Sequence, residues 1–221
     1  MQSGTLGSWR FIKHAGLCSV IAPGGIQIAA SGGAPGSGVA GADAFGVEDA
    51  TSPDGATVQH MRFGFRSGGF FTAEPDAHLA IGVAGRWRKD NPSTPSFDGC
   101  LMGRGIIIGN VSGAPQGCPQ APVVQIESFR RDGNALFATT CSPRLQDDVD
   151  YEITLWADVH GAIGYRVCNA SKEPLAECRV NDHGANIPAG LGGWWITHVF
   201  SDSHPDADWT LAFVDLSIWW E

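Results

Sequence analysis

Alternating apolar segments in the last third of the chain constrain its fold more than any other feature. Residues 151–158 and 161–169 alternate between apolar and polar side chains and flank a short turn around His160. Side chains of a strand point alternately to opposite faces, so this pattern predicts two half-buried strands joined as a hairpin. Residues 175–180 are expected to add a third strand beside them. The C-terminal part of the chain is therefore predicted to form an antiparallel sheet.

Short β-branched and aromatic runs separated by glycine and proline continue through the rest of the chain. They predict about twelve strands and no helix of three or more turns, a pattern typical of sandwiches and jelly rolls. The expected fold class is all-β, with two antiparallel sheets. Residues 1–56 are expected to form an N-terminal hairpin and a Gly-rich arm of the same domain, and residues 57–221 the jelly-roll core. Within the arm, residues 31–55 are expected to be a long loop.

Charge and hydropathy exclude several classes of protein. The net charge is −9 and no basic tract is present, so nucleic acid is not an expected partner. No apolar run approaches the roughly 20 residues that span a bilayer. The N-terminus has no basic region followed by an apolar one, so no signal peptide is expected. The expected location is a virion or an extracellular surface.

The six cysteines leave the redox state open. No Cys-x-x-Cys spacing occurs, which disfavours zinc and thioredoxin-like sites. Cys168 and Cys178 flank a short polar stretch and could face each other across a hairpin, and Cys100 and Cys118 flank another. Disulfides and buried free thiols both remain open.

The hairpin and the final strand resemble those of the concanavalin A-like lectin/glucanase jelly rolls. The resemblance is carried by Tyr151-Glu-Ile-Thr-Leu-Trp, by Gly164-Tyr-Arg-Val and by the terminal run from Trp209 to Trp219. It covers roughly residues 57–220. It implies a last strand that returns to the centre of a sheet. The superfamily includes sugar-binding lectins, glycoside hydrolases, polysaccharide lyases and modules of phage virion and tail-fibre surfaces.

The catalytic motifs of the superfamily are missing. Its hydrolases carry Glu-x-Asp-x-x-Glu on one strand, whereas Glu127 stands alone. Hydrolysis also needs two carboxylates flanking the bond. Glu152 and Asp158 are six residues apart and are expected to be a solvated strand position and its turn. No catalytic residue is therefore assigned.

A candidate glycan-binding face is assembled from residues on several predicted strands. Arginines beside a histidine or tyrosine base are what a polysaccharide lyase needs to neutralise a uronate and remove its proton. The competing reading is that these arginines pair with surface acids or stack on aromatic rings. The face comprises Arg62, Arg66, Arg86, Trp87, Arg104 and Glu127, with His60 nearby.

Two further sets of residues are candidates for partners and metal. In the adjacent pairs Trp194–Trp195 and Trp219–Trp220, one ring of each pair is expected to face the core and the other a sugar or protein partner. Asp202, Asp206 and Asp208 offer oxygen ligands for Ca²⁺, although their spacing is not that of an EF-hand and favours a structural turn.

These observations favour a non-enzymatic structural or recognition module with carbohydrate-binding capacity. The expected setting is a homo-oligomer on a surface, such as a phage capsid, tail or adhesin, with other assembly proteins and a cell-surface polysaccharide as partners. The alternative is a polysaccharide-degrading enzyme, a lyase or glycoside hydrolase, that acts on acidic glycans through the arginine-lined face.

Overall fold

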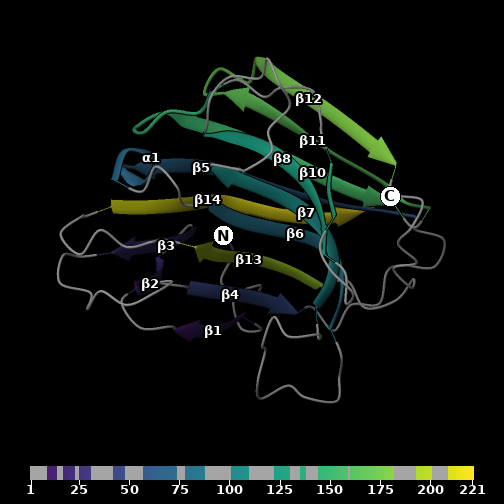
Figure 1. Cartoon of the computed structure of the whole chain (residues 1–221), viewed down its shortest axis with the longest axis horizontal. Coiled ribbons are helices and arrows are strands. Elements are labelled where there is room, and N and C mark those ends of the chain that lie inside the picture. The colour runs from purple at the N-terminus through teal and green to yellow at the C-terminus, as the bar shows by residue number, and fades with distance from the viewer. Residues whose placement is uncertain are drawn as a thin grey trace.

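The computed structural model contains two antiparallel seven-stranded sheets that pack face to face (Figure 1). The residues that the structure describes are 9–13, 17–22, 25–30, 42–47, 57–73, 78–87, 101–109, 122–129, 135–137, 144–158, 160–181, 193–200 and 209–221. The predicted all-β, two-sheet antiparallel sandwich is confirmed.

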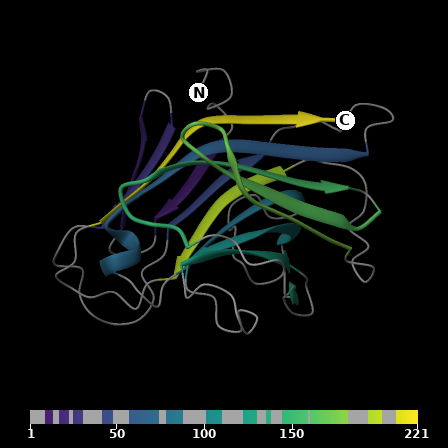
Figure 2. The same cartoon turned by 90° about the horizontal axis from the view of Figure 1, so that it is seen from above.

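The order of strands in each sheet mixes early and late segments of the chain. In order across the sheet, sheet A contains β1 (Trp9–Lys13), β4 (Ala42–Val47), β13 (Gly193–Phe200), β6 (His78–Trp87), β7 (Leu101–Gly109), β8 (Val123–Phe129) and β9 (Ala135–Phe137). Sheet B contains β12 (Pro174–Asn181), β11 (Ala162–Asn169), β10 (Asp150–Asp158), β5 (Val58–Gly68), β14 (Trp209–Trp220), β3 (Gly25–Ala30) and β2 (Leu17–Ala22). Figure 2 shows the two layers, with β14 and β5 in one and β7 and β8 in the other.

The core lies between the sheets and follows from strand alternation. On β5, Met61, Phe63 and Phe65 are buried, whereas Arg62 and Arg66 between and beside them are exposed. Sheet A contributes the facing aliphatic side chains Leu79, Ile81, Ile106, Ile108, Val124 and Ile126. Burying such side chains removes apolar surface from water, which stabilises the sandwich.

A hydrogen bond between Tyr165 and Val124 joins the two sheets through the core. The Tyr165 hydroxyl of β11 is fully buried and donates to the backbone carbonyl of Val124 on β8, at 3.1 Å. A buried hydroxyl without such a partner would be costly. The bond therefore fixes how the middle of β11 faces the start of β8.

The segments predicted from the last third of the chain are confirmed. β10 pairs with β11 from Tyr151↔Asn169 to Ala157↔Ile163, and β12 extends the meander. β14 lies inside sheet B between β5 and β3, as the resemblance implied. Within the described residues the single helix is the four-residue α1 (Phe70–Ala73).

The expectation that residues 31–55 form a long loop is wrong, and the state of two cysteines that the sequence left open is resolved. The Gly-rich segment contains β4, which pairs with β1 and β13 in sheet A, because a long-range pairing overrides its low strand propensity. Cys168 and Cys178 are free and buried. Their register partners are Pro174 and Tyr165, so the two thiols lie on opposite faces of the sheet and do not face each other.

Asp147 fastens the connection before β10 to the end of β5 and to α1. Its carboxylate accepts hydrogen bonds from the Ser67 and Thr72 hydroxyls and from the backbone amides of Phe71 (3.1 Å) and Thr72 (2.9 Å). Partial burial alone would raise the pKa of Asp147, but these donors together lower it below the ordinary aspartate value. The ionised carboxylate thus satisfies amides at the start of the helix that would otherwise lack partners.

Candidate functional site

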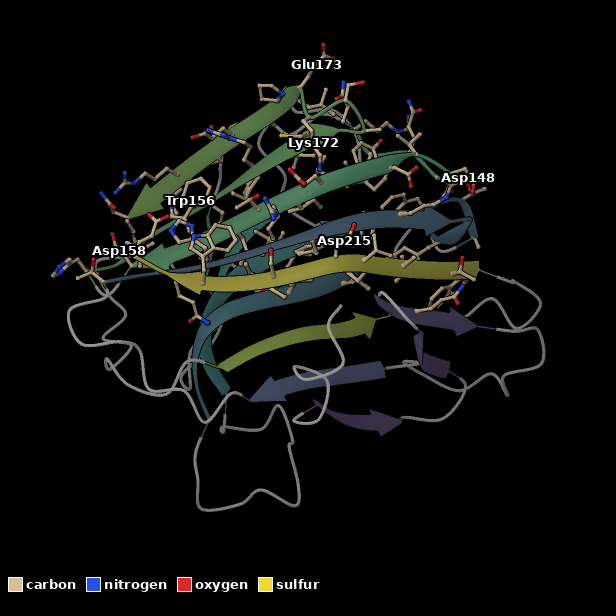
Figure 3. All side chains as sticks on the ribbon, turned by 180° about the vertical axis from the view of Figure 1, so that it is seen from behind. Asp148, Trp156, Asp158, Lys172, Glu173 and Asp215 are labelled. Atoms are coloured by element: carbon tan, nitrogen blue, oxygen red, sulfur yellow. The ribbon has the colours of Figure 1, made fainter. Side chains whose placement is uncertain are left out.

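Polar side chains cover the outer face of sheet B (Figure 3). Strand pairing aligns them in rows across the sheet. One row runs Glu177, Arg166, Thr154, Arg62 and Ser217, and the next runs Arg179, Gly164, Trp156, His60 and Trp219. Figure 3 shows Trp156 and Asp158 toward one end of this face, Asp148 at the other, and Asp215 between them.

A groove of about 450 Å³ crosses this face and is called the sheet B groove below. Four structural parts of sheet B contribute to it: β5, β10, the β11–β12 turn and β14. Its lining consists of Arg62, Phe63, Gly64, Asp150, Tyr151, Glu152, Asn169, Ala170, Lys172 and Asp215. Small-molecule sites typically measure about 300–1,000 Å³, so the groove matches a ligand of one or two sugar rings in size.

The β11–β12 turn forms one wall, and Asn169 organises it. The Asn169 side chain accepts from the Glu173 amide at 3.0 Å and donates to the Glu173 carboxylate at 2.8 Å. Lys172 adopts a left-handed backbone conformation (φ 65°), and its ammonium forms an ion pair with Glu152 of β10. This geometry holds Lys172 over the face of the sheet.

A β-bulge in β14 forms the opposite wall. The register with β5 shifts between Val214 and Ser217, and Asp215 within the bulge has φ 52°. A bulge adds a residue and redirects its side chain, and aspartate is among the few residues that tolerate a left-handed backbone. The Asp215 side chain is consequently exposed and lines the groove.

The charged groups beside the groove are mostly paired. Arg66 contacts Asp150 and Asp148, each at 3.3 Å. These bonds, chiefly that to Asp150, hold the pKa of Arg66 above its ordinary value. The Arg62 guanidinium lies over the Trp219 ring, 5.9 Å from its centroid.

The aromatic row next to the groove is engaged within the protein. His60 and Trp219 stack with centroids 4.8 Å apart and planes 4° apart, so each covers a face of the other. Glu221 approaches both rings, at 3.3 Å from His60 Nε2 and 3.2 Å from Trp219 Nε1. Trp156 lies over Gly164, where a Cβ atom would collide with the indole ring. The row stabilises the sheet through cross-strand packing.

The structure divides the predicted glycan-binding face between the two sheets. Arg62 and Arg66 lie on β5 of sheet B, whereas Arg86 and Trp87 lie on β6, Arg104 on β7 and Glu127 on β8, all in sheet A. The expectation that the arginines share one sheet face is therefore wrong, because β5 and β6 follow each other in sequence but belong to opposite layers. Glu127 is buried opposite Gly105. Glycan contact by these residues stays a prediction.

The predicted partner and metal residues are only partly described. Trp219 faces outward and is half-buried, and the side chains of Trp194, Trp195 and Trp220 are outside the described set. Asp202, Asp206 and Asp208 lie outside the described residues altogether. Across the side chains that the structure does describe, no group of three or more His, Cys, Asp or Glu residues is arranged to hold a metal ion.

The sequence interpretation missed most of the groove. It placed Glu152 at an outward strand position, which is correct, but did not assign a role to Asp150, Asn169, Lys172 or Asp215. The signal for Asn169 was its place at the end of a predicted strand, four residues before Glu173. The signal for the bulge at Asp215 was a change of phase, because apolar residues fall at positions 209, 211 and 213 before it and at 216, 218 and 220 after it.

Chemically, the groove offers hydrogen-bond donors and acceptors in close succession. Carboxylates accept, guanidinium and ammonium groups donate, and the Asn169 carbonyl and amide can do both. Such a set suits a ligand rich in hydroxyl groups.

None of the helices described in the structure is long and apolar enough to cross a membrane.

Comparisons with solved structures show the fold. The exoplasmic/lumenal domain of VIP36 in its Ca²⁺-bound form aligns with TM-score 0.59 and 13% identity over 97% of this chain and 86% of its own. The potassium-bound Emp46p carbohydrate recognition domain aligns with TM-score 0.62 and 11% identity over 99% of this chain and 91% of its own. Family 7 alginate lyase A1-II′ aligns with TM-score 0.50 and 8% identity over 89% of this chain and 80% of its own. No family model and no curated protein sequence matches the chain. The chain has a legume-lectin-type, concanavalin A-like jelly-roll fold.

Proposed function

We propose that the chain is a non-enzymatic recognition module that binds carbohydrate in the sheet B groove. The observation that carries the proposal is the groove itself, where polar side chains from β5, β10, the β11–β12 turn and β14 converge around a volume of about 450 Å³. The fold supports this reading, because Emp46p is described as a carbohydrate recognition domain and VIP36 has a Ca²⁺/Man2-bound form.

Most of the groups in the groove that could act as a catalytic acid or base are engaged within the protein. A lyase needs a histidine or tyrosine base, and a glycosidase needs a carboxylic acid that donates a proton. Among the described residues that line the groove there is no histidine, and the Tyr151 hydroxyl accepts a hydrogen bond from the Gln146 amide at 3.0 Å. Glu152 and Asp150 accept from Lys172 and Arg66. Binding without turnover is the function that this arrangement favours.

The proposal extends to the setting in which the module acts. We place it on the surface of a larger homo-oligomeric assembly, such as a virion or an adhesin, where its glycan is a cell-surface polysaccharide. The resemblance of the hairpin and the last strand to jelly rolls of such assemblies motivates this setting. Light scattering that shows a monomer at all concentrations, with no docking on larger particles, would contradict it.

Replacing Arg62 by alanine is expected to weaken glycan binding about ten-fold while the protein stays folded. A hydrogen bond to a charged group contributes about 1.5–3 kcal/mol, and ten-fold in Kd corresponds to about 1.4 kcal/mol. Arg62 is exposed, so its removal costs little stability. A glycan array identifies the tightest ligand, and titration calorimetry then compares the variants.

Arg179→Ala is the matched control for this substitution. Arg179 is exposed on β12 of the same face and does not line the groove. Calorimetry should give the wild-type Kd for this variant. Equal Kd values for Arg62→Ala and Arg179→Ala, or release of unsaturated products from a polysaccharide, would overturn the proposal.

A further inference from the structure

Asp215 differs from the other carboxylates of the groove because it has no charged partner. Glu152 pairs with Lys172, and Asp150 pairs with Arg66. Among the described residues no ion pair or hydrogen bond engages the Asp215 carboxylate, although the side chain is exposed and lines the groove. Its charge is therefore available to a ligand.

The backbone holds this carboxylate in place at a conformational cost. Asp215 has φ 52° in the bulge that interrupts the pairing of β14 with β5. Residues in sparsely populated conformations persist where the surrounding structure determines them. On either side of the bulge, Val214 pairs with Gly64 and Ser217 with Arg62. The ladder on both sides therefore fixes where the Asp215 side chain leaves the sheet.

The other charges around the groove are engaged within the protein. Three carboxylates and the two cations Arg62 and Lys172 line it, and Arg66 beside it pairs with Asp150. Arg62 already lies over the Trp219 ring, and Lys172 is bound to Glu152. The whole chain carries a net charge of −9, which attracts cations and repels anions over longer distances. An anionic uronate would meet repulsion from Asp215 and from the net charge of the molecule.

We infer that the sheet B groove selects a hexosamine unit whose free ammonium group pairs with Asp215. The inference rests on the proposed carbohydrate binding and specifies its ligand class. The ammonium donates to the unpaired carboxylate, and the ring hydroxyls meet Glu152, Asn169 and Arg62. An N-acetylated or neutral sugar keeps the hydroxyl contacts but leaves Asp215 without its counter-ion. This selectivity is opposite to that expected of a module for acidic glycans.

The test compares three tetrasaccharides by titration calorimetry at low salt: a glucosamine tetramer, its fully N-acetylated counterpart and a galacturonic acid tetramer. We expect the free amine to bind about five-fold more tightly than the N-acetylated sugar, in the range of one exposed ion pair, and the uronate to bind most weakly. Added salt should shrink the preference, because it screens exposed charges.

Variants of Asp215 assign the preference to this carboxylate. Asp215→Asn keeps the shape and Asp215→Gly keeps the left-handed backbone, so both should fold. Each should bring the ratio of the two Kd values close to one, whereas Glu177→Gln, which removes an exposed carboxylate outside the groove, should leave it unchanged.

The outcomes separate this inference from the proposed function. Equal binding of the free and N-acetylated sugars, or a preference that survives both Asp215 variants, overturns the hexosamine inference and leaves carbohydrate binding standing. Binding of none of the three, together with an empty glycan array, overturns both. A wild-type preference that Glu177→Gln also removes would show a general charge effect and contradict the role of Asp215.

Discussion

Phe213→Ala is expected to lower the free energy of unfolding by about 3–5 kcal/mol. Phe213 lies on β14 with no exposed surface, and its ring centroid is 5.8 Å from that of Phe63 and 5.5 Å from that of Phe65. Truncation removes buried apolar surface and leaves a cavity among rings that cannot fully collapse. Urea denaturation followed by tryptophan fluorescence measures the loss, with the slope of the transition unchanged.

The neighbouring residue provides the control for Phe213. Val214 is 43% exposed on the outer face of the same strand, so Val214→Ala should change the unfolding free energy by less than about 0.5 kcal/mol. A loss for Phe213→Ala as small as that for Val214→Ala would show that β14 does not hold the centre of the core.

Asp147→Asn is expected to cost about 2–3 kcal/mol at neutral pH. An asparagine keeps one acceptor oxygen but turns an amide toward the Ser67 and Thr72 hydroxyls or the two backbone donors, so at least one hydrogen bond to a charged group is lost. Thermal and urea unfolding measure the loss.

The same substitution changes how the free energy of unfolding depends on pH under acidic conditions. The folded-state pKa of Asp147 is lower than its unfolded value, so its stabilising contribution is complete above the ordinary aspartate pKa of about 3.9. The contribution is lost as the pH falls below that value and through the folded pKa. Asp147→Asn should therefore lose less stability than the wild type below about pH 4.

Asp148→Asn is the matched control for this pH dependence. Asp148 is the next residue, is exposed and contacts Arg66 at 3.3 Å. Asparagine tolerates its left-handed backbone (φ 61°). An exposed ion pair contributes about 1 kcal/mol or less. If Asp148→Asn changes the loss of stability at low pH as much as Asp147→Asn does, the effect belongs to general surface charge and not to Asp147.

Much of the fold was predictable because strand alternation is a local property. The period of two in residues 151–158 identified which side chains of β10 face the core, and the short turn around His160 paired β10 with β11. The interior position of β14 was implied by the resemblance to known jelly rolls and not by the residues alone.

The division of residues between sheets was not predictable, because it depends on long-range pairing. Arg66 and Arg86 lie on consecutive strands, β5 and β6, yet these strands belong to different layers. Alternation determines which face of a strand a side chain occupies, but the identity of the sheet is set by partners far away in sequence. For the same reason β4 was missed within a Gly-rich segment, where β13 supplies its partner.

The groove was hidden for a related reason. Gly64, Glu152, Asn169 and Asp215 come together only through the pairing of β5 with β10 and β14 and of β11 with β12. The bulge that exposes Asp215 leaves only a shift of the apolar residues from positions 209, 211 and 213 to positions 216, 218 and 220. A site built from register shifts and left-handed residues becomes visible only in three dimensions.

Backbone amide shifts during titration with the tightest-binding tetrasaccharide test the central claim most directly. If the sheet B groove binds carbohydrate, saturable shifts should concentrate at Gly64, Glu152, Asn169, Lys172 and Asp215, which line it. Amides of β7 and β8 in the opposite sheet should not move. Shifts confined to β7 and β8, or no saturable shift with any bound glycan, would contradict the assignment of the site.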